Sequence, residues 1–357
     1  MSLNIPVIQP EMISLIDQRC VSGEVLTSNQ VSQWRNEGYL LVDGIFQESS
    51  IQSALNEIKI LQMSKEGASE FEVGDGKTFP TMLESLDALT LCPDFLTAMQ
   101  QLLGTDDIRM CQAETWKKVA VKCENGTDNT FSNQDQRMHM DFPNHTLVHP
   151  PQWDKPEAVA VIIYLSEDTE CGGATRVVPR LPSPSVDDLY QWPYTNMPGY
   201  GEIPWSNDRP STEEMLSERY PDVARFREQL YAREKSITYS PGTVLFYRHD
   251  LWHRGTPLIP GSERFVMNLV FKRTGCDWLN HWNRGTAYSM YSRTQYVEKL
   301  IAKLTPEQRS CLGFPRPGSA YWTPDTLEAV RRRYEVFGMD MTPYTLTTSA
   351  APVSVSK

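Results

Sequence analysis

The chain has 357 residues, 40% of them hydrophobic and 22% charged, which is ordinary for a globular protein with a substantial core. Its net charge of −11 argues against nucleic acid and anionic membranes as partners, because both require a basic surface. No apolar run approaches the roughly 18 residues of a membrane span, and the N-terminus has neither the basic nor the apolar region of a signal peptide. We therefore expect a cytoplasmic protein, a monomer or a homodimer.

Three helices are predicted in the first hundred residues. Thr27-Ser-Asn-Gln30 has the form of a capping box that opens the first helix, and Gly38 ends it. Ser49 or Ser50 caps the second helix, and Pro93 begins the third. These helices are expected to pack against a sheet.

Short strands dominate the middle of the chain. Apolar or alternating runs bounded by turn residues predict strands at 39–42, 108–121, 158–165, 175–178, 236–239, 243–247 and 264–273. Few helices separate these strands, which favours antiparallel pairing over a parallel sheet. The expected fold is mainly β with flanking helices, and its core is a double-stranded β-helix, the jelly roll of cupin-like proteins.

A single catalytic domain is expected over residues 26–340, between an N-terminal arm at 1–25 and a flexible tail at 341–357. An insert at about 181–233 interrupts the strands and ends in a helical pair. Its first thirty residues contain six prolines and five aromatic residues. Disordered segments are poor in aromatic residues, so this composition favours an ordered lid. Helices are expected again at about 293–340.

A histidine and a carboxylate stand two residues apart in Gln136-Arg-Met-His-Met-Asp141. Side chains at positions i and i+2 of a strand leave the same face, so His139 and Asp141 can be neighbouring ligands of one metal ion. More than a hundred residues later comes a third candidate ligand, His253. Two histidines and one carboxylate form the facial triad of non-haem Fe(II) oxygenases.

His249 competes with His253 for the distal position, since a strand would present both on one face. The sequence Trp-His-Arg-Gly and the eleven-residue interval to Arg264 favour His253. Arg264 opens an apolar strand, and its guanidinium can bind a carboxylate through two parallel hydrogen bonds. A hairpin over residues 257–263 is expected to place Arg264 beside the strand that ends near His253.

His139-x-Asp141, His253 and Arg264 together resemble the pattern of the phytanoyl-CoA dioxygenase family of Fe(II)- and 2-oxoglutarate-dependent oxygenases. The stretches 26–43 and 171–179 are also similar to this family's opening helix and strand and to its glycine turn. The resemblance implies that His139, Asp141 and His253 bind Fe(II), that 2-oxoglutarate and O₂ are co-substrates, and that Arg264 holds the distal carboxylate of 2-oxoglutarate.

Three further positions are compared with the family's co-substrate residues. The family often has a glutamine on the strand that contains Gln112, which would point into the barrel; the alternative is that this polar face is a solvated edge. Many relatives have a serine two residues after the metal histidine, where this chain has Gly255. Thr256 or a water molecule could take over that role.

The reaction implied by the resemblance is hydroxylation of a small organic molecule, with release of succinate and CO₂. Desaturation or ring closure remain open. Related halogenases have a small residue in the place of Asp141, which leaves room for chloride, so we do not expect halogenation. The alternatives are a cupin-type metalloenzyme that does not use 2-oxoglutarate and a jelly-roll binding protein without activity.

The substrate is expected to have an apolar body and an anionic group. This prediction depends on arginines gathered at the opening of the barrel and on aromatic residues near it. The candidate substrate contacts are Arg176, Arg180, Trp205, Tyr247 and Trp252, with Arg248 and Arg254 close to the metal histidine. The alternative is that the arginines pair with nearby acids such as Glu167, Asp168 and Glu170.

Overall fold

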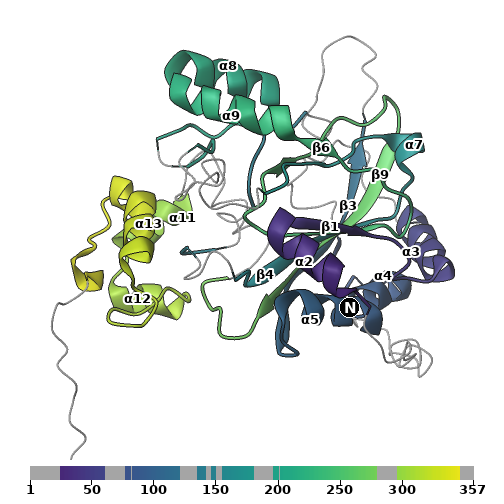
Figure 1. The fold of residues 1–357 in the computed structure, drawn as a ribbon, viewed down its shortest axis with the longest axis horizontal. Coiled ribbons are helices and arrows are strands. Elements are labelled where there is room, and N and C mark those ends of the chain that lie inside the picture. The colour runs from purple at the N-terminus through teal and green to yellow at the C-terminus, as the bar shows by residue number, and fades with distance from the viewer. Residues whose placement is uncertain are drawn as a thin grey trace, which may run out of the picture.

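The structure is a computed structural model that describes residues 25–60, 77–81, 83–120, 135–141, 146–149, 155–180, 196–200, 202–279 and 296–345. Over these ranges the strands form two antiparallel sheets, one of six strands and one of three. Groups of helices lie on different sides of the sheets (Figure 1). The predicted architecture, a mainly β jelly-roll core with flanking helices, is confirmed.

The larger sheet brings together strands from both halves of the chain. Its strands, in spatial order, are β1 (Tyr39–Val42), β7 (Val244–Tyr247), β4 (Ala158–Tyr164), β9 (Glu263–Arg273), β3 (Ile108–Val119) and β2 (Lys77–Thr78). The strand predicted at 158–165 is buried on both faces. It is also an interior strand of the sheet, because β7 and β9 pair with its two edges.

The smaller sheet consists of β6 (Lys235–Ser236), β5 (Arg176–Val177) and β8 (His253–Arg254), in that order. β8 and β9 follow each other in the chain but belong to different sheets. The connection between them therefore crosses from one sheet to the other. The predicted hairpin is wrong, because consecutive strands of a jelly roll need not pair with each other.

Four helices cover the outer face of the larger sheet: α2 (Ser28–Glu37), α3 (Glu48–Ile60), α4 (Glu84–Thr90) and α5 (Pro93–Leu103). The predicted capping box is present in α2, where the Thr27 hydroxyl accepts from the Gln30 amide. Gly38 ends this helix with a φ of 87°, which is the left-handed conformation that glycine adopts without strain. The ring of Phe95, on α5, is fully buried against phenylalanines of β7 and β9.

The inner face of the larger sheet looks toward the smaller sheet. Strand alternation turns Ala158, Ala160 and Tyr164 inward, while Val159 and Val161 face the helices. The inward residues pack with Val177 of β5 and with Tyr247 of β7. This space between the two sheets is where the candidate site lies.

The C-terminal helices form a second core. They are α11 (Tyr296–Lys303), α12 (Pro306–Cys311) and α13 (Pro324–Tyr334), followed by 3₁₀ turns at Glu335–Phe337 and Thr342–Tyr344. Their apolar residues enclose Leu147 and Val148. Met341 and Tyr344 are buried in this core, so the tail predicted to be flexible from residue 341 is packed through its first residues.

Helix boundaries differ from the predictions at a few positions. α3 begins at Glu48, because the Gln47 carbonyl already accepts from the Ser50 and Ile51 amides, so neither serine is its cap. The short helix α4 was not predicted, whereas α12 lies within the helices expected at about 293–340. The insert contains the expected pair, α8 (Arg209–Arg219) and α9 (Pro221–Arg233).

The arm predicted at 1–25 lies outside the described residues except for Val25, and so does the part of the predicted lid at 181–195. Among the helices that the structure describes, none has both the length and the apolar character required to cross a membrane.

Candidate metal centre

The two candidate metal histidines are joined through their backbones. The His139 amide donates to the His253 carbonyl at 2.9 Å, and the His253 amide donates to the His139 carbonyl at 2.8 Å. This bridge brings together residues that are more than a hundred positions apart in the chain. The imidazole rings lie with their centroids 4.4 Å apart.

Both imidazoles are oriented by the same kind of contact. Nδ1 of His139 lies 3.1 Å from the Arg137 carbonyl oxygen, and Nδ1 of His253 lies 2.9 Å from the Leu251 carbonyl oxygen. A carbonyl can only accept, so each Nδ1 must hold the proton. The Nε2 atoms then have free lone pairs, which is the tautomer that binds metal.

Asp141 completes the cluster. Its Oδ1 lies 3.7 Å from Nε2 of His139, and its Oδ2 lies 3.5 Å from Nε2 of His253. Two ligands of one ion at bond lengths of roughly 2.1 Å can be at most about 4.2 Å apart, and the two distances from Asp141 are shorter than this. One ligand atom from each of the three residues lies within 4.8 Å of the other two. Two imidazole nitrogens and a carboxylate in this arrangement could hold a single divalent ion.

Tyr247 fixes the carboxylate. Its hydroxyl donates to Oδ2 of Asp141 at 2.6 Å, and its ring lies 4.9 Å from that of His253. Burial, together with the Asp141 carboxylate, raises the pKa of Tyr247 well above its usual value, so the phenol keeps its proton and remains a donor. Tyr247 as a substrate contact stays a prediction; its hydroxyl binds the carboxylate of the candidate ligand Asp141.

The structure separates the two histidines that competed for the distal position. His253 lies in the three-residue cluster, and His249 does not. Burial lowers the pKa of His249 to about 4 and that of His139 well below its usual value, with His253 adding to both shifts. Both side chains are therefore neutral at pH 7.

Arg264 is buried on the inner face of β9. One of its terminal nitrogens donates to the Gly173 carbonyl, while its Nε has no hydrogen-bond partner among the described residues. No carboxylate in the described ranges of the chain forms an ion pair with Arg264. A buried guanidinium of this kind is suited to an anionic ligand.

Lys118 lies directly across from Arg264 in the pairing of β3 with β9. Its ammonium group is also buried and donates to the Thr256 carbonyl at 3.1 Å. Two cations thus stand side by side on the inner face, and Lys118 contacts Thr256, which is three residues after His253 in the chain. Lys118 was not among the site residues predicted from the sequence.

Gln112 also lies on the inner face. It pairs with Val270, whose side chain belongs to the inner cluster, and its Oε1 is buried without a hydrogen-bond partner among the described residues. Glu114 and Lys118, on the same face, are almost fully buried. The alternative of a solvated edge is therefore wrong for this strand.

Gly255 stands where many members of the resembled family have a serine. Its amide donates to Oε1 of Gln136 at 2.8 Å, and a Cβ at this position would lie only 2.7 Å from that oxygen. Gln136 thus occupies the space that a side chain at 255 would need. The Thr256 hydroxyl donates to the Ala174 carbonyl at 2.7 Å, so its proton is already engaged.

No protein-family model matches the chain, and no curated protein matches it. Among solved structures, the non-heme alpha ketoglutarate dependent epimerase SnoN from nogalamycin biosynthesis is 14% identical, covers 69% of this chain and 82% of its own, and has a TM-score of 0.45. EctD from S. alaskensis with 2-oxoglutarate and 5-hydroxyectoine is 14% identical, with coverages of 72% and 80% and a TM-score of 0.47.

HygX from Streptomyces hygroscopicus, with nickel and 2-oxoglutarate bound, is 13% identical, with coverages of 72% and 90% and a TM-score of 0.43. The similar structures are thus those of non-haem enzymes that depend on or bind 2-oxoglutarate. Membership in the phytanoyl-CoA dioxygenase family stays a prediction.

The arginines expected at the opening of the barrel are paired with acids. In the smaller sheet Arg176 lies opposite Arg254, and Val177 lies opposite His253. Since Val177 packs in the inner cluster, alternation turns both arginines to the other face. There Arg254 pairs with Glu234 at 2.7 Å and also with Asp135, and Arg176 lies 4.0 Å from Glu234.

Arg180 and Arg248 share another acid. Both donate to Oδ2 of Asp250 at 2.6 Å, and all three side chains are buried. Although burial alone would raise the pKa of Asp250, the two arginines hold it below its usual value. The arginines do pair with acids, although their partners are not Glu167, Asp168 or Glu170. These arginines therefore no longer support the prediction of an anionic group on the substrate.

The other aromatic candidates pack in the protein interior or against the chain. Trp252 is fully buried among Met138, Met140 and Val178. It lies on the side of the segment containing Met138 and Met140 that is opposite to the three candidate metal ligands. Trp205 packs against Gly199, where an added Cβ would lie 2.9 Å from its ring. Neither placement supports a substrate contact.

Proposed function

We propose that the protein is an Fe(II)- and 2-oxoglutarate-dependent oxygenase of the phytanoyl-CoA dioxygenase type, acting on a small organic molecule. His139, Asp141 and His253 would hold Fe(II). The observation that carries this proposal is the pair of imidazoles whose Nδ1 atoms face backbone carbonyls, so that both Nε2 lone pairs converge on Asp141. Three protein ligands leave coordination positions open for co-substrate and O₂.

Arg264 would bind the distal carboxylate of 2-oxoglutarate. Its guanidinium is buried with an unpartnered Nε, and Lys118 beside it adds a second positive charge. Gln112, with a buried amide oxygen on the same face, would line the same space. When bound, Fe(II) with 2-oxoglutarate and O₂ supplies an oxidant able to remove hydrogen from carbon, and succinate and CO₂ are released.

The protein's own residues would orient and shield this chemistry. Tyr247 holds the Asp141 carboxylate, the Arg137 and Leu251 carbonyls hold the imidazoles, and the inner apolar cluster excludes water. Hydroxylation, desaturation and ring closure are all compatible with this arrangement. Because the arginines are paired with acids, we propose no charged group on the substrate.

Anaerobic titration with Fe(II) tests the proposal. The wild type should take up one Fe(II), develop a visible charge-transfer band on addition of 2-oxoglutarate, and consume O₂ only when both are present. His253→Ala should abolish metal uptake, whereas His249→Ala should retain it. Metal uptake without the 2-oxoglutarate band would instead indicate a cupin-type metalloenzyme, and no uptake would indicate a binding protein.

A further inference from the structure

The segment 135–141, here named the ligand strand, contains His139 and forms isolated β-bridges rather than a regular strand ladder; it is held on two sides. Five consecutive amides, those of residues 136–140, have identified acceptors. The amides of Gln136 and His139 donate to the Gly255 and His253 carbonyls, on the side of the smaller sheet. The other three amides donate to residues of the insert. The acceptors are the Asn207 carbonyl for Arg137, the Tyr231 hydroxyl for Met138 and Met197 Sδ for Met140.

The insert therefore takes the place of a neighbouring strand. An edge strand without a partner exposes its amides and carbonyls, and buried groups of this kind require partners. Here the partners are two side chains of α9, those of Tyr231 and Arg227, together with Met197 Sδ and the backbone of Asn207 and Arg209. The residues flanking the metal ligand His139 are both held in this way, at 3.0 Å for the Met138 amide and 3.4 Å for the Met140 amide.

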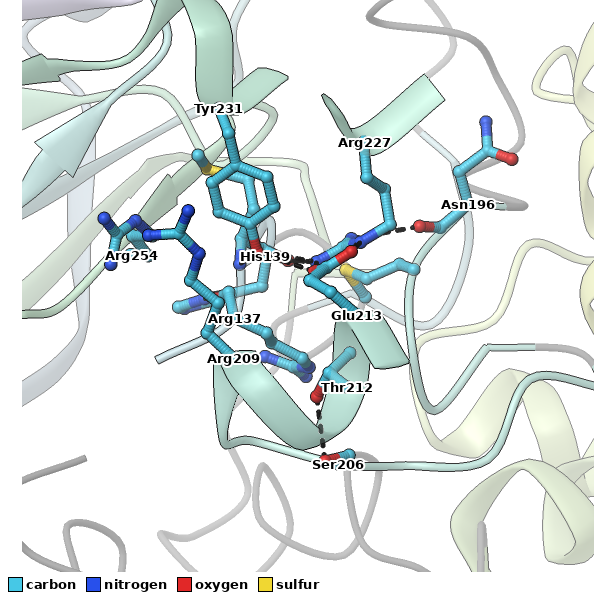
Figure 2. A network of polar contacts seen from close by, with 12 residues as sticks. Arg137, His139, Asn196, Ser206, Arg209, Thr212, Glu213, Arg227, Tyr231 and Arg254 are labelled. Atoms are coloured by element: carbon cyan, nitrogen blue, oxygen red, sulfur yellow. Dashed lines mark hydrogen bonds and ion pairs between the residues drawn. The ribbon is translucent and has the colours of Figure 1, made fainter. Parts of the chain in front are cut away.

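Met138 is held at both of its backbone polar groups. The Tyr231 hydroxyl accepts from its amide at 3.0 Å, and Nη2 of Arg227 donates to its carbonyl oxygen at 3.0 Å. Glu213 of α8 joins the two side chains of α9, accepting from Tyr231 at 2.7 Å and from Arg227 Nη2 at 2.8 Å. Figure 2 shows Tyr231, Arg227 and Glu213 converging next to the strand of His139.

Burial limits how easily water can replace these contacts, because Arg227 is fully buried and Tyr231 and Glu213 are half-buried. Arg227 is 0% exposed, and it also donates to the Asn196 carbonyl at 3.2 Å. Its charge is balanced by the Glu213 carboxylate. Loss of one member leaves a buried polar group of the ligand strand or of the cluster without a partner.

We propose that Tyr231, Arg227 and Glu213 are positioning residues that set the metal affinity of the site by holding the peptide groups next to His139. The insert is then a support of the ligand strand over residues 196–233. This inference rests on the proposed function, because it takes His139 as a metal ligand. Groups that orient a metal ligand typically change metal affinity by about 10- to 100-fold when they are removed.

The test compares two tyrosines whose hydroxyls bind backbone groups. Tyr231→Phe removes the acceptor of the Met138 amide, whereas Tyr334→Phe removes the hydroxyl of a fully buried tyrosine, which donates to the Leu147 carbonyl at 2.6 Å, outside the ligand strand. Co(II) binding is measured by titration and by its visible absorption spectrum. We expect Tyr231→Phe to weaken Co(II) binding about 10-fold and to alter the spectrum, and Tyr334→Phe to leave both unchanged.

A second variant and a second measurement guard against misfolding. Arg227→Lys retains the charge opposite Glu213 but not the fork, and it should weaken Co(II) binding at least as much as Tyr231→Phe does. Hydrogen exchange of the metal-free protein should become faster over residues 136–140 in Tyr231→Phe and stay unchanged there in Tyr334→Phe.

The outcomes separate the two proposals. Unchanged Co(II) affinity in Tyr231→Phe, with normal binding by the wild type, overturns the positioning role. If the wild type takes up no Co(II), the proposed function fails, and with it the effect on metal affinity. The hydrogen-exchange comparison then decides alone whether the insert holds the strand.

Discussion

The two faces of the six-stranded sheet are built from the same strands but differ in chemistry. On the outer face Val159, Val161 and Phe271 pack with apolar residues of four helices. On the inner face Lys118 and Arg264 stand opposite each other, both buried. Burying apolar surface stabilises the fold, whereas taking a charged group out of water costs free energy. The comparison indicates that the outer face provides stability and that the inner face gives up some of it for binding.

The largest effect should come from the outer face. Phe95 is 0% exposed and contacts the rings of Phe46, Phe246 and Phe271. Phe95→Ala should lower the free energy of unfolding by about 3–5 kcal/mol, since it leaves a cavity among aromatic rings. Urea denaturation measures this loss, and the folded fraction should keep its Fe(II) affinity. A loss below about 1 kcal/mol would contradict the assignment of stability to this face.

Arg264 tests the inner face. Arg264→Met should weaken 2-oxoglutarate binding by about 3 kcal/mol, toward the lower end for a broken buried charge pair, because the Gly173 carbonyl already takes one donor. Arg264→Lys retains the charge without the fork and should also bind more weakly. Neither change should lower the free energy of unfolding of the free protein. Equal co-substrate affinity in wild type and both variants would remove Arg264 from the site.

The buried His249 should make the stability of the protein depend on pH. Its pKa falls from 6.5 to about 4 in the folded protein, chiefly through burial. Below pH 6.5 the His249 imidazole binds a proton in the unfolded chain but not in the folded chain. The free energy of unfolding therefore falls as the pH drops from about 6.5 to about 4. One such group accounts for a loss on the order of 3 kcal/mol. Urea denaturation of metal-free wild type and His249→Asn across this range should give a shallower decline for the variant, and identical declines would refute the prediction.

Tyr247 should give the smallest effect. Tyr247→Phe keeps the ring against His253 and removes only the hydrogen bond to Asp141. Fe(II) affinity should fall about 10-fold, or about 1.4 kcal/mol, because the carboxylate loses the donor that orients it. Isothermal titration can measure the change. A Tyr247→Phe variant that bound Fe(II) as tightly as wild type would show that the carboxylate needs no such donor.

Features with local causes could be predicted from the sequence. The capping box at Thr27 and Gln30, the left-handed Gly38 and the buried strand at 158–165 are each specified by residues close together in the chain. The spacing of His139 and Asp141 predicted that these two side chains share one face, and both lie in one cluster with His253. Alternation along a strand requires no knowledge of the rest of the fold.

Features that depend on distant partners could not be predicted. Arg180 pairs with Asp250, seventy positions away, and nothing near Arg180 in the sequence indicates this acid. The face on which Arg254 lies depends on the sheet to which β8 belongs. The chain between β8 and β9 has the turn residues of a hairpin, although it crosses from one sheet to the other. The roles of Tyr231 and Arg227 require the position of α9 relative to the ligand strand.

The contact between Gly255 and Gln136 restricts how this site can change during evolution. A serine at 255 would place its Cβ 2.7 Å from the Gln136 amide oxygen, so the end of the Gln136 side chain would have to move away. That movement breaks the hydrogen bond from the Gly255 amide to Gln136. A change from glycine to serine at 255 therefore requires a second change, in the position or the identity of the side chain at 136.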